Sequence, residues 1–222
     1  MQSAAAAGVA INTKNFIETN SIVDQHIAEE IRKYATENIS VVFTSMNAVD
    51  AVIDVLELDG VIPDWTIYAM GGVTKNLIKN YFIDSELIAD ATNSTELAQI
   101  IVDNEETDLV FFCGNHRRDE LPLLLDKHGI ALQEVVVYET VELPVKIEKE
   151  YGAILFFSPS AVRSVFKTNK LPGHTVLFAI GKTTAEALTK HSDNKVVTGG
   201  FPDKEKLAAT AIEFLKASKQ SM

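Results

Sequence analysis

The sequence repeats itself, and this internal repeat is the feature that most limits the folds available to the chain. Three pairs of short segments match in the same order within the 222 residues. They are 43–49 with 156–162, 70–74 with 180–184, and 96–98 with 206–208, at offsets of 113, 110 and 110 residues. Because one series of segments occurs twice in register, we expect two similar domains rather than one large domain.

The matched segments have the pattern of a strand followed by a turn and a helix. In the first pair, an apolar run ends at Phe43 or Phe156, and a polar turn then leads into Ala-Val. In the second pair, short apolar runs end at Gly71 and Gly181, where helical patterns begin. Strands that alternate with helices predict parallel sheets covered by helices, in which ligands bind beyond the carboxyl ends of the strands. The repeated polar turns fall at those ends.

The two copies do not simply follow one another. Residues 7–19 resemble 128–140 at an offset of 121 residues, so the chain starts with the tail of a repeat unit. We expect it to cross over, build the second domain and return to finish the first. The expected boundaries are 1–19 with 145–222 for domain 1, 23–137 for domain 2, and 16–22 and 135–145 for linkers that pair as two strands. By the same comparison, a strand and most of a helix are missing before Gln2.

Composition excludes several classes of partner. The chain has 20 Lys and Arg against 31 Asp and Glu, a net charge of −11, which disfavours nucleic acid and anionic membranes. Cys113 is the only cysteine, so the chain forms no internal disulfide, and no Cys/His cluster indicates a metal. Without an export signal or a long apolar segment, we expect a cytoplasmic protein, and we expect a monomer.

The polar turns are candidate anion sites. At the start of a helix several backbone N–H groups lack partners and carry partial positive charge, so they can bind carboxylates without Lys or Arg. The alternative for Thr44, Ser45, Ser158 and Ser160 is simple N-capping of the following helices. For the glycines of the second pair, the alternative is a tight turn that needs a residue without Cβ.

The usual catalytic and nucleotide motifs are absent. Neither GxxxxGK[ST] nor GxGxxG occurs, so a nucleotide is not supported. Cys113 with His116 is a weak argument for a nucleophile, because turn geometry decides their distance. Arg117 and Arg118 either anchor carboxylates or are solvated side chains.

Six segments in order closely resemble those of the uroporphyrinogen-III synthase family. They are VVFTSMNAV, IYAMGGVTKNLI, FFCGNHRRDELPLLLDKHGI, VVVYETV, ILFFSPSAVRSVF and FAIGKTTAEAL. The resemblance covers about residues 41–215. It implies an α/β fold with two flavodoxin-like parallel-sheet domains joined by a two-stranded linker, with the substrate between the domains.

The same resemblance implies a cofactor-free lyase of haem biosynthesis. It would close hydroxymethylbilane, a linear tetrapyrrole, into uroporphyrinogen III with inversion of ring D through a spiro intermediate. Tyr138 matches the tyrosine near the chemistry and is the candidate general acid. The matching substrate-binding residues are Thr44, Ser45, Gly72, Thr74, Gly114, Asn115, Ser158, Ser160, Lys182 and Thr183.

Two other functions fit parts of the pattern. A non-catalytic bilobal protein that binds or senses a small molecule also has two α/β lobes joined by two crossings. A receiver-like regulatory module would need aspartates at the strand ends around Mg²⁺. The strand ends here carry Ser, Thr, Gly and Cys instead, so the bilobal binder is the main alternative.

Overall fold

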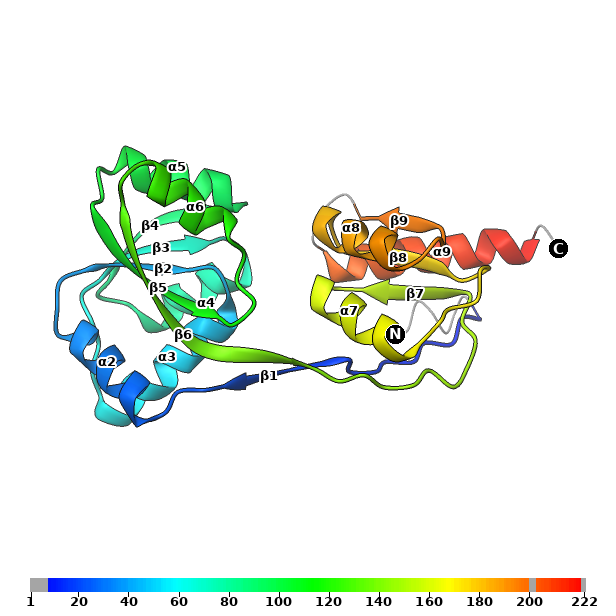
Figure 1. The fold of residues 1–222 in the computed structure, drawn as a ribbon, viewed down its shortest axis with the longest axis horizontal. Coiled ribbons are helices and arrows are strands. Elements are labelled where there is room, and N and C mark those ends of the chain that lie inside the picture. Colours follow the sequence, from blue (N-terminus) through cyan, green and yellow to red (C-terminus); the bar gives the residue numbers. More distant parts are fainter. Residues whose placement is uncertain (1–7, 200–202, 221–222) are drawn as a thin grey trace. The chain divides into compact units, whose positions relative to one another are not determined.

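The computed structural model describes residues 8–199 and 203–220, and the chain forms two compact units (Figure 1). Unit 1 is Met1–Glu18 together with Val141–Met222, and unit 2 is Thr19–Thr140. The segment between the two parts of unit 1 is therefore unit 2 itself. The expectation that a strand and most of a helix are missing before Gln2 concerns the start of the chain, which lies outside the described residues.

Unit 2 alternates strands and helices along most of its length. Its elements, including two strands that extend across the unit boundary, are β1 (Ile17–Ser21), α2 (Gln25–Ala35), β2 (Ser40–Phe43), α3 (Met46–Asp59), β3 (Thr66–Met70), α4 (Val73–Tyr81), β4 (Glu86–Ala91), α5 (Ser94–Asp103), β5 (Asp108–Gly114), α6 (Glu120–Lys127) and β6 (Ala131–Glu142). The prediction of a mixed α/β fold with parallel sheets is confirmed.

The sheet of unit 2 has the order β1-β6-β5-β2-β3-β4, and β6, β5, β2, β3 and β4 are parallel. Numbered along the chain from β2, these five strands run 3-2-1-4-5. A flavodoxin-like sheet runs 2-1-3-4-5, so the order in unit 2 differs from the flavodoxin-like arrangement that the resemblance implies. A strand-turn-helix pattern predicts parallel strands, but it does not predict their order in the sheet. In unit 2 the chain adds two strands on one side of β2 and then places β5 on the other side.

The central strands of unit 2, β2 and β5, are apolar on both faces because helices cover both faces. Val41 and Phe43 of β2 pack in a core under α2, α3 and α4, whereas Val42 between them packs in a second core under α5 and α6. Phe111 and Phe112 of β5 divide between the two cores in the same way. This alternation follows from the two-residue period of a strand. Figure 1 shows α5 and α6 on one side of the sheet and α2 and α3 on the other.

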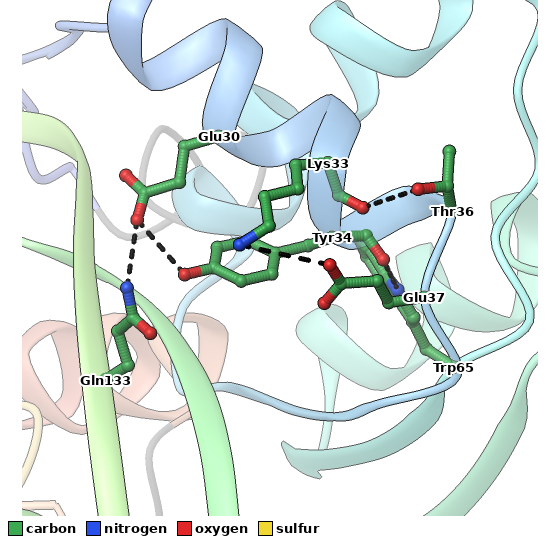
Figure 2. Close-up of polar contacts among 7 residues, drawn as sticks. All are labelled: Glu30, Lys33, Tyr34, Thr36, Glu37, Trp65 and Gln133. Atoms are coloured by element: carbon green, nitrogen blue, oxygen red, sulfur yellow. Dashed lines mark hydrogen bonds and ion pairs between the residues drawn. The ribbon is translucent and has the colours of Figure 1, made fainter.

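A cluster around Tyr34 ties α2 to β6 and to the segment before β3 (Figure 2). Trp65, which is buried just before β3, donates from Nε1 to the carbonyl oxygen of Tyr34 at 2.9 Å. Glu30 accepts hydrogen bonds from the Tyr34 hydroxyl and from Gln133 of β6, both at 3.1 Å. Burial, with the Glu30 contact second, raises the pKa of Tyr34 to about 12. These bonds hold α2 against the edge of the core that it covers.

The two segments expected to pair, 16–22 and 135–145, do so. Ile22 N donates to Val137 O at 3.1 Å, and Leu143 N donates to Phe16 O at 2.8 Å. The residue numbers rise on one strand as they fall on the other, so β1 runs antiparallel to β6. β6 thus pairs with β5 along its first part and with β1 towards its end.

Unit 1 contains β7 (Ala153–Phe156), α7 (Pro159–Thr168), β8 (Val176–Ala179), α8 (Lys182–His191), β9 (Val196–Thr198) and α9 (Lys204–Gln220). Its described strands form a parallel sheet of order β7-β8-β9. This order also differs from the flavodoxin-like arrangement, in which the first strand lies between the second and third. One core lies against α7 and α8, and another lies against α9. None of the described helices has the combination of length and apolar character that crossing a bilayer requires.

Two buried hydroxyl groups in unit 1 provide a matched test of stability. Thr175 Oγ1 donates to Tyr151 O at 2.7 Å, whereas Ser164 Oγ, buried in α7, has no partner among the described residues. We expect Thr175→Val to lower the free energy of unfolding by about 1–2 kcal/mol, because it removes the hydrogen bond that the partly buried carbonyl of Tyr151 accepts. Ser164→Ala should raise it by about 0.5 kcal/mol, because Ala is the better helix former and no bond is lost. Urea unfolding measures both, and a Ser164→Ala loss as large as that of Thr175→Val would contradict the assignment.

Candidate functional site

In unit 2 the parallel strands bring the predicted turns to one edge of the sheet. Phe43, the last residue of β2, lies beside Ala69 of β3 and Phe112 of β5. The turns that follow these strands therefore start side by side. The strand order reverses between β2 and β5, where sheets of this kind bind ligands. Thr44 and Ser45 follow β2 at this point, and Gly114 ends β5 next to them.

Ser45 and Ser158, which are equivalent in the repeat, are helix N-caps. Ser45 Oγ accepts a hydrogen bond from Asn47 N at 3.2 Å at the start of α3, and Ser158 Oγ accepts one from Ala161 N at 3.2 Å at the start of α7. The capping interpretation is therefore correct for these two serines. Each side-chain oxygen satisfies one backbone donor of its helix, so fewer amides remain for a ligand there.

The helices after the two glycine turns start differently. Neither α4, which follows Gly72, nor α8, which follows Gly181, has a side-chain cap. Within the described part of the chain, the N–H groups of Val73 and Thr74 in α4 and of Lys182 in α8 have no hydrogen-bond partner. Gly72 has φ 74°, a conformation that favours glycine. The repeat thus places two open helix starts within one residue of equivalent positions, one in each unit.

Tyr138, Gly114 and Asn115 lie together where β5 ends beside the middle of β6. A Cβ on Gly114 would be only 2.3 Å from Cζ of Tyr138, so the phenol ring occupies the space that any other residue would need. Asn115 N donates to Tyr138 O at 3.1 Å, and Asn115 Oδ1 accepts from Thr140 N at 2.9 Å. The register shifts between Cys113 and Gly114, which is typical of a bulge that redirects a side chain. Gly114 therefore positions the tyrosine.

Arg117 is held inside unit 2. Its Nε donates to Glu134 at 2.6 Å, and its Nη1 pairs with Asp119. The hydrogen bond to Glu134 is the main reason that the pKa of Arg117 is raised further. With both contacts in place, Arg117 is a structural ion pair rather than an open carboxylate anchor. Arg118 is exposed in the same turn.

Cys113 is unsuited to act as a nucleophile. Its side chain is buried in the core under α5 and α6, and burial raises the pKa of its thiol to about 11. His116 is exposed in the turn beyond it. Among the residues that the structure describes, no three His, Cys, Asp or Glu side chains form a group that could hold a metal ion.

In unit 1 the turn after β7 contains a contact that the sequence analysis missed. Arg163 Nη2 donates to Ser160 Oγ at 3.1 Å, and its Nε donates to Glu142 at 3.0 Å. Ser160 and Arg163 are three residues apart on a helix, a spacing that places side chains on one face and was the available signal. The expected site residues Lys182 and Thr183 are exposed in the first turn of α8.

Apolar side chains are exposed among these turns, which the sequence analysis also missed. Met46 and Val73, the first residues of α3 and α4, are 42% and 63% exposed. Phe157, directly after β7, is 45% exposed, and Lys204 Nζ lies 5.7 Å from its ring centre. The strand ends therefore offer apolar surface as well as amide donors.

The comparisons with known proteins agree on one family. A family model described as uroporphyrinogen-III synthase HemD matches residues 4–209. The chain belongs to the uroporphyrinogen-III synthase family. The uroporphyrinogen-III synthase of Saccharomyces cerevisiae is 32% identical over 181 residues, and the match covers 69% of this chain but only 66% of the yeast protein.

Solved structures of the family share the fold. A uroporphyrinogen-III synthetase from Helicobacter pylori has a TM-score of 0.66 at 18% identity, covering 90% of this chain and 91% of its own. A mutant uroporphyrinogen III synthase from the extremely thermophilic bacterium Thermus thermophilus has a TM-score of 0.70 at 16% identity, covering 98% and 92%. At these identities the likeness establishes the shared α/β fold.

Replacing Gly114 tests how the tyrosine is positioned. In Gly114→Ala the new Cβ must displace the Tyr138 ring, so we expect a loss of about 1–3 kcal/mol of unfolding free energy and a change in the Tyr138 ring resonances. Gly173→Ala is the control, because a Cβ there meets no atom within 4 Å. Unchanged Tyr138 resonances in Gly114→Ala would show that the ring does not rest on this glycine.

The buried thiol makes a second prediction. With a pKa of about 11 for Cys113, about one thiol in a thousand is ionised at pH 8, so iodoacetamide should react at least about 100-fold faster in urea than in the folded protein. Because the folded-state pKa is raised, the stability gained by keeping this thiol neutral is complete below about pH 8.5 and declines as pH rises towards 11. Equal alkylation rates in the two states would disprove the burial.

Proposed function

We propose that this chain is a uroporphyrinogen-III synthase, converting hydroxymethylbilane to uroporphyrinogen III with inversion of ring D. Membership of the family supports the reaction. The observation that carries the proposal is the equivalent pair of uncapped helix starts, α4 and α8. Hydroxymethylbilane is a flexible octacarboxylate, and open amides at helix starts bind carboxylates.

The charges around these turns favour recognition by the main chain. The protein has a net charge of −11, yet surface charges beyond about 8–10 Å are screened by salt, whereas a helix start acts at contact distance. Lys182 is the cation nearest to an open amide in sequence, and its ammonium group is exposed and 4.0 Å from Glu186. We infer that its backbone N–H matters more than its side chain.

The apolar residues at the turns fit the rest of the substrate. A tetrapyrrole carries its carboxylates on flat pyrrole rings, which need apolar surface. Met46, Val73 and Phe157 provide such surface beside the amide donors. The proposed substrate-binding residues remain Thr44, Ser45, Gly72, Thr74, Gly114, Asn115, Ser158, Ser160, Lys182 and Thr183.

Most of the reactivity belongs to the substrate. Loss of its hydroxyl group gives an azafulvene, the substituted carbon of ring D attacks, and the spiro intermediate fragments and recloses with that ring inverted. The protein has to hold the chain in the bend that lets this carbon attack and to exclude the alternative closure. Tyr138 is the proposed general acid for the leaving hydroxyl, and Gly114 holds its ring in place.

We also propose the organisation in which this activity works. The units act as two domains, 1–19 with 145–222 and 23–137, and the paired segments 16–22 and 135–145 link them. We propose that the protein is a cytoplasmic monomer that uses no cofactor and binds no nucleic acid. The alternative, a non-catalytic bilobal protein that binds a small molecule, predicts ligand binding without turnover.

One assay separates the enzyme from the binder. Supplied with hydroxymethylbilane, the protein should yield uroporphyrinogen III, whereas uncatalysed closure gives the isomer without ring inversion. Chromatography of the oxidised porphyrins measures the ratio of isomers. A ratio equal to that of the protein-free reaction would rule out the synthase.

Tyr138→Phe tests the role of Tyr138 as general acid. It should reduce kcat by about 10²–10⁴-fold if Tyr138 is the acid, and an unchanged kcat would remove Tyr138 from the mechanism.

A pair of substitutions at Lys182, at the start of α8, tests recognition by the main chain. Lys182→Pro removes the N–H group but suits the first position of a helix, and the preceding Gly181 is extended with ψ 177°, as proline requires. Lys182→Ala removes the ammonium group and keeps the N–H group. We expect KM to rise about tenfold in Lys182→Pro and less than about threefold in Lys182→Ala. The opposite ranking would show that the side chain binds the substrate.

A further inference from the structure

Three charged side chains meet where β6 ends against α7, all within unit 1. Glu142, the last residue of β6, accepts a hydrogen bond from Arg163 Nε at 3.0 Å. Lys167 Nζ lies 2.7 Å from its other oxygen, in a close ion pair that lacks hydrogen-bond geometry. The Glu142 side chain is only 13% exposed. Lys167 and then Arg163 lower the pKa of Glu142 despite its burial, so it is a carboxylate.

Arg163 extends this cluster to the start of α7. While its Nε holds Glu142, its Nη2 donates to Ser160 Oγ at 3.1 Å. A guanidinium group can only donate, so the serine oxygen must be the acceptor, and its own hydrogen is left to donate elsewhere. The guanidinium group therefore directs the hydroxyl group of Ser160 to act as a hydrogen-bond donor towards any further partner.

Ser160 also carries the remaining open amide of this helix start. Pro159 has no N–H group, and the N–H of Ala161 is capped by Ser158. Within the described residues the N–H of Ser160 has no partner. One residue thus offers two donors, N–H and O–H, and a carboxylate can accept both.

We infer that Arg163 is a positioning residue that orients the Ser160 hydroxyl to donate to a substrate carboxylate, and that Glu142 holds Arg163 in place for this task. The inference rests on the proposed function and adds residues that the family resemblance did not supply. Arg163 can act on the substrate through Ser160, because its Nε and Nη2 are engaged by Glu142 and Ser160. The positive charge behind the serine oxygen also makes its hydrogen a stronger donor.

Steady-state kinetics of Arg163→Met, Ser160→Ala and the double variant test the inference. We expect each single variant to raise KM for hydroxymethylbilane about tenfold, with kcat within about threefold of the wild type. The double variant should be no worse than either single one, because Arg163 acts only through Ser160. An unchanged KM in Arg163→Met, or effects that multiply in the double variant, would overturn the inference.

Two further variants separate positioning from charge and from folding. Lys167→Met removes a cation from the same carboxylate but does not touch Ser160, so its KM should stay within about twofold of the wild type. Arg163→Lys keeps the charge beside Glu142 but lacks the planar fork, so it should raise KM as Arg163→Met does. If urea titrations show that Arg163→Met is unfolded, Arg163→Lys replaces it in the kinetic test. A KM increase in Lys167→Met equal to that in Arg163→Met, or full rescue by Arg163→Lys, would overturn the positioning role.

Failure of this inference is distinct from failure of the proposed function. If the wild-type protein leaves the isomer ratio at its protein-free value, the synthase assignment fails. If the wild type forms uroporphyrinogen III while Arg163→Met keeps its KM, only the role of Arg163 fails.

Discussion

The burial of β2 between two helical layers is the constraint on which unit 2 depends. Val41, Val42 and Phe43 are all fully buried and pair with strands on both sides. A strand with no polar face can be stable only in the middle of a parallel sheet covered twice. That position forces the turns after β2, β3 and β5 to the same edge. The geometry of the candidate site is therefore a consequence of core packing, because loops alone would not hold three turns in register.

The helices of the repeat have two kinds of start, one with a side-chain cap and one without. α3 and α7 satisfy their first amides with Ser45 and Ser158, which stabilises the helices at the cost of donors for a ligand. α4 and α8 leave amides open, and they follow turns that contain glycine. An uncapped start costs roughly 1 kcal/mol per helix in the unliganded protein. If a polycarboxylate accepts hydrogen bonds from these open amides, the same free energy contributes to its binding.

The sequence predicted what depends on local pattern and periodicity. The repeat gave the strand-turn-helix units and the parallel sheets, because each follows from nearby residues. The pairing of 16–22 with 135–145 followed from the order of the repeat copies, since the chain crosses twice between them. The strand order could not be predicted, because the direction of each crossover depends on which helices pack together in three dimensions. The ring of Tyr138 on Gly114 was missed because those residues are on different strands and meet through a bulge. Arg163 was overlooked although its spacing from Ser160 was readable.

The burial of Cys113 has a practical consequence for measuring motion between the units. It is the only cysteine in the chain, and its thiol is protected in the folded state. A dye or spin label added to native protein will therefore attach to cysteines introduced on the surface and leave position 113 unlabelled. One such position in unit 2 is Leu58, which is 83% exposed, and Lys190 is an exposed position in unit 1. Fluorescence resonance energy transfer or electron paramagnetic resonance between labels at two such positions can measure the distance between the units in solution without altering the native thiol.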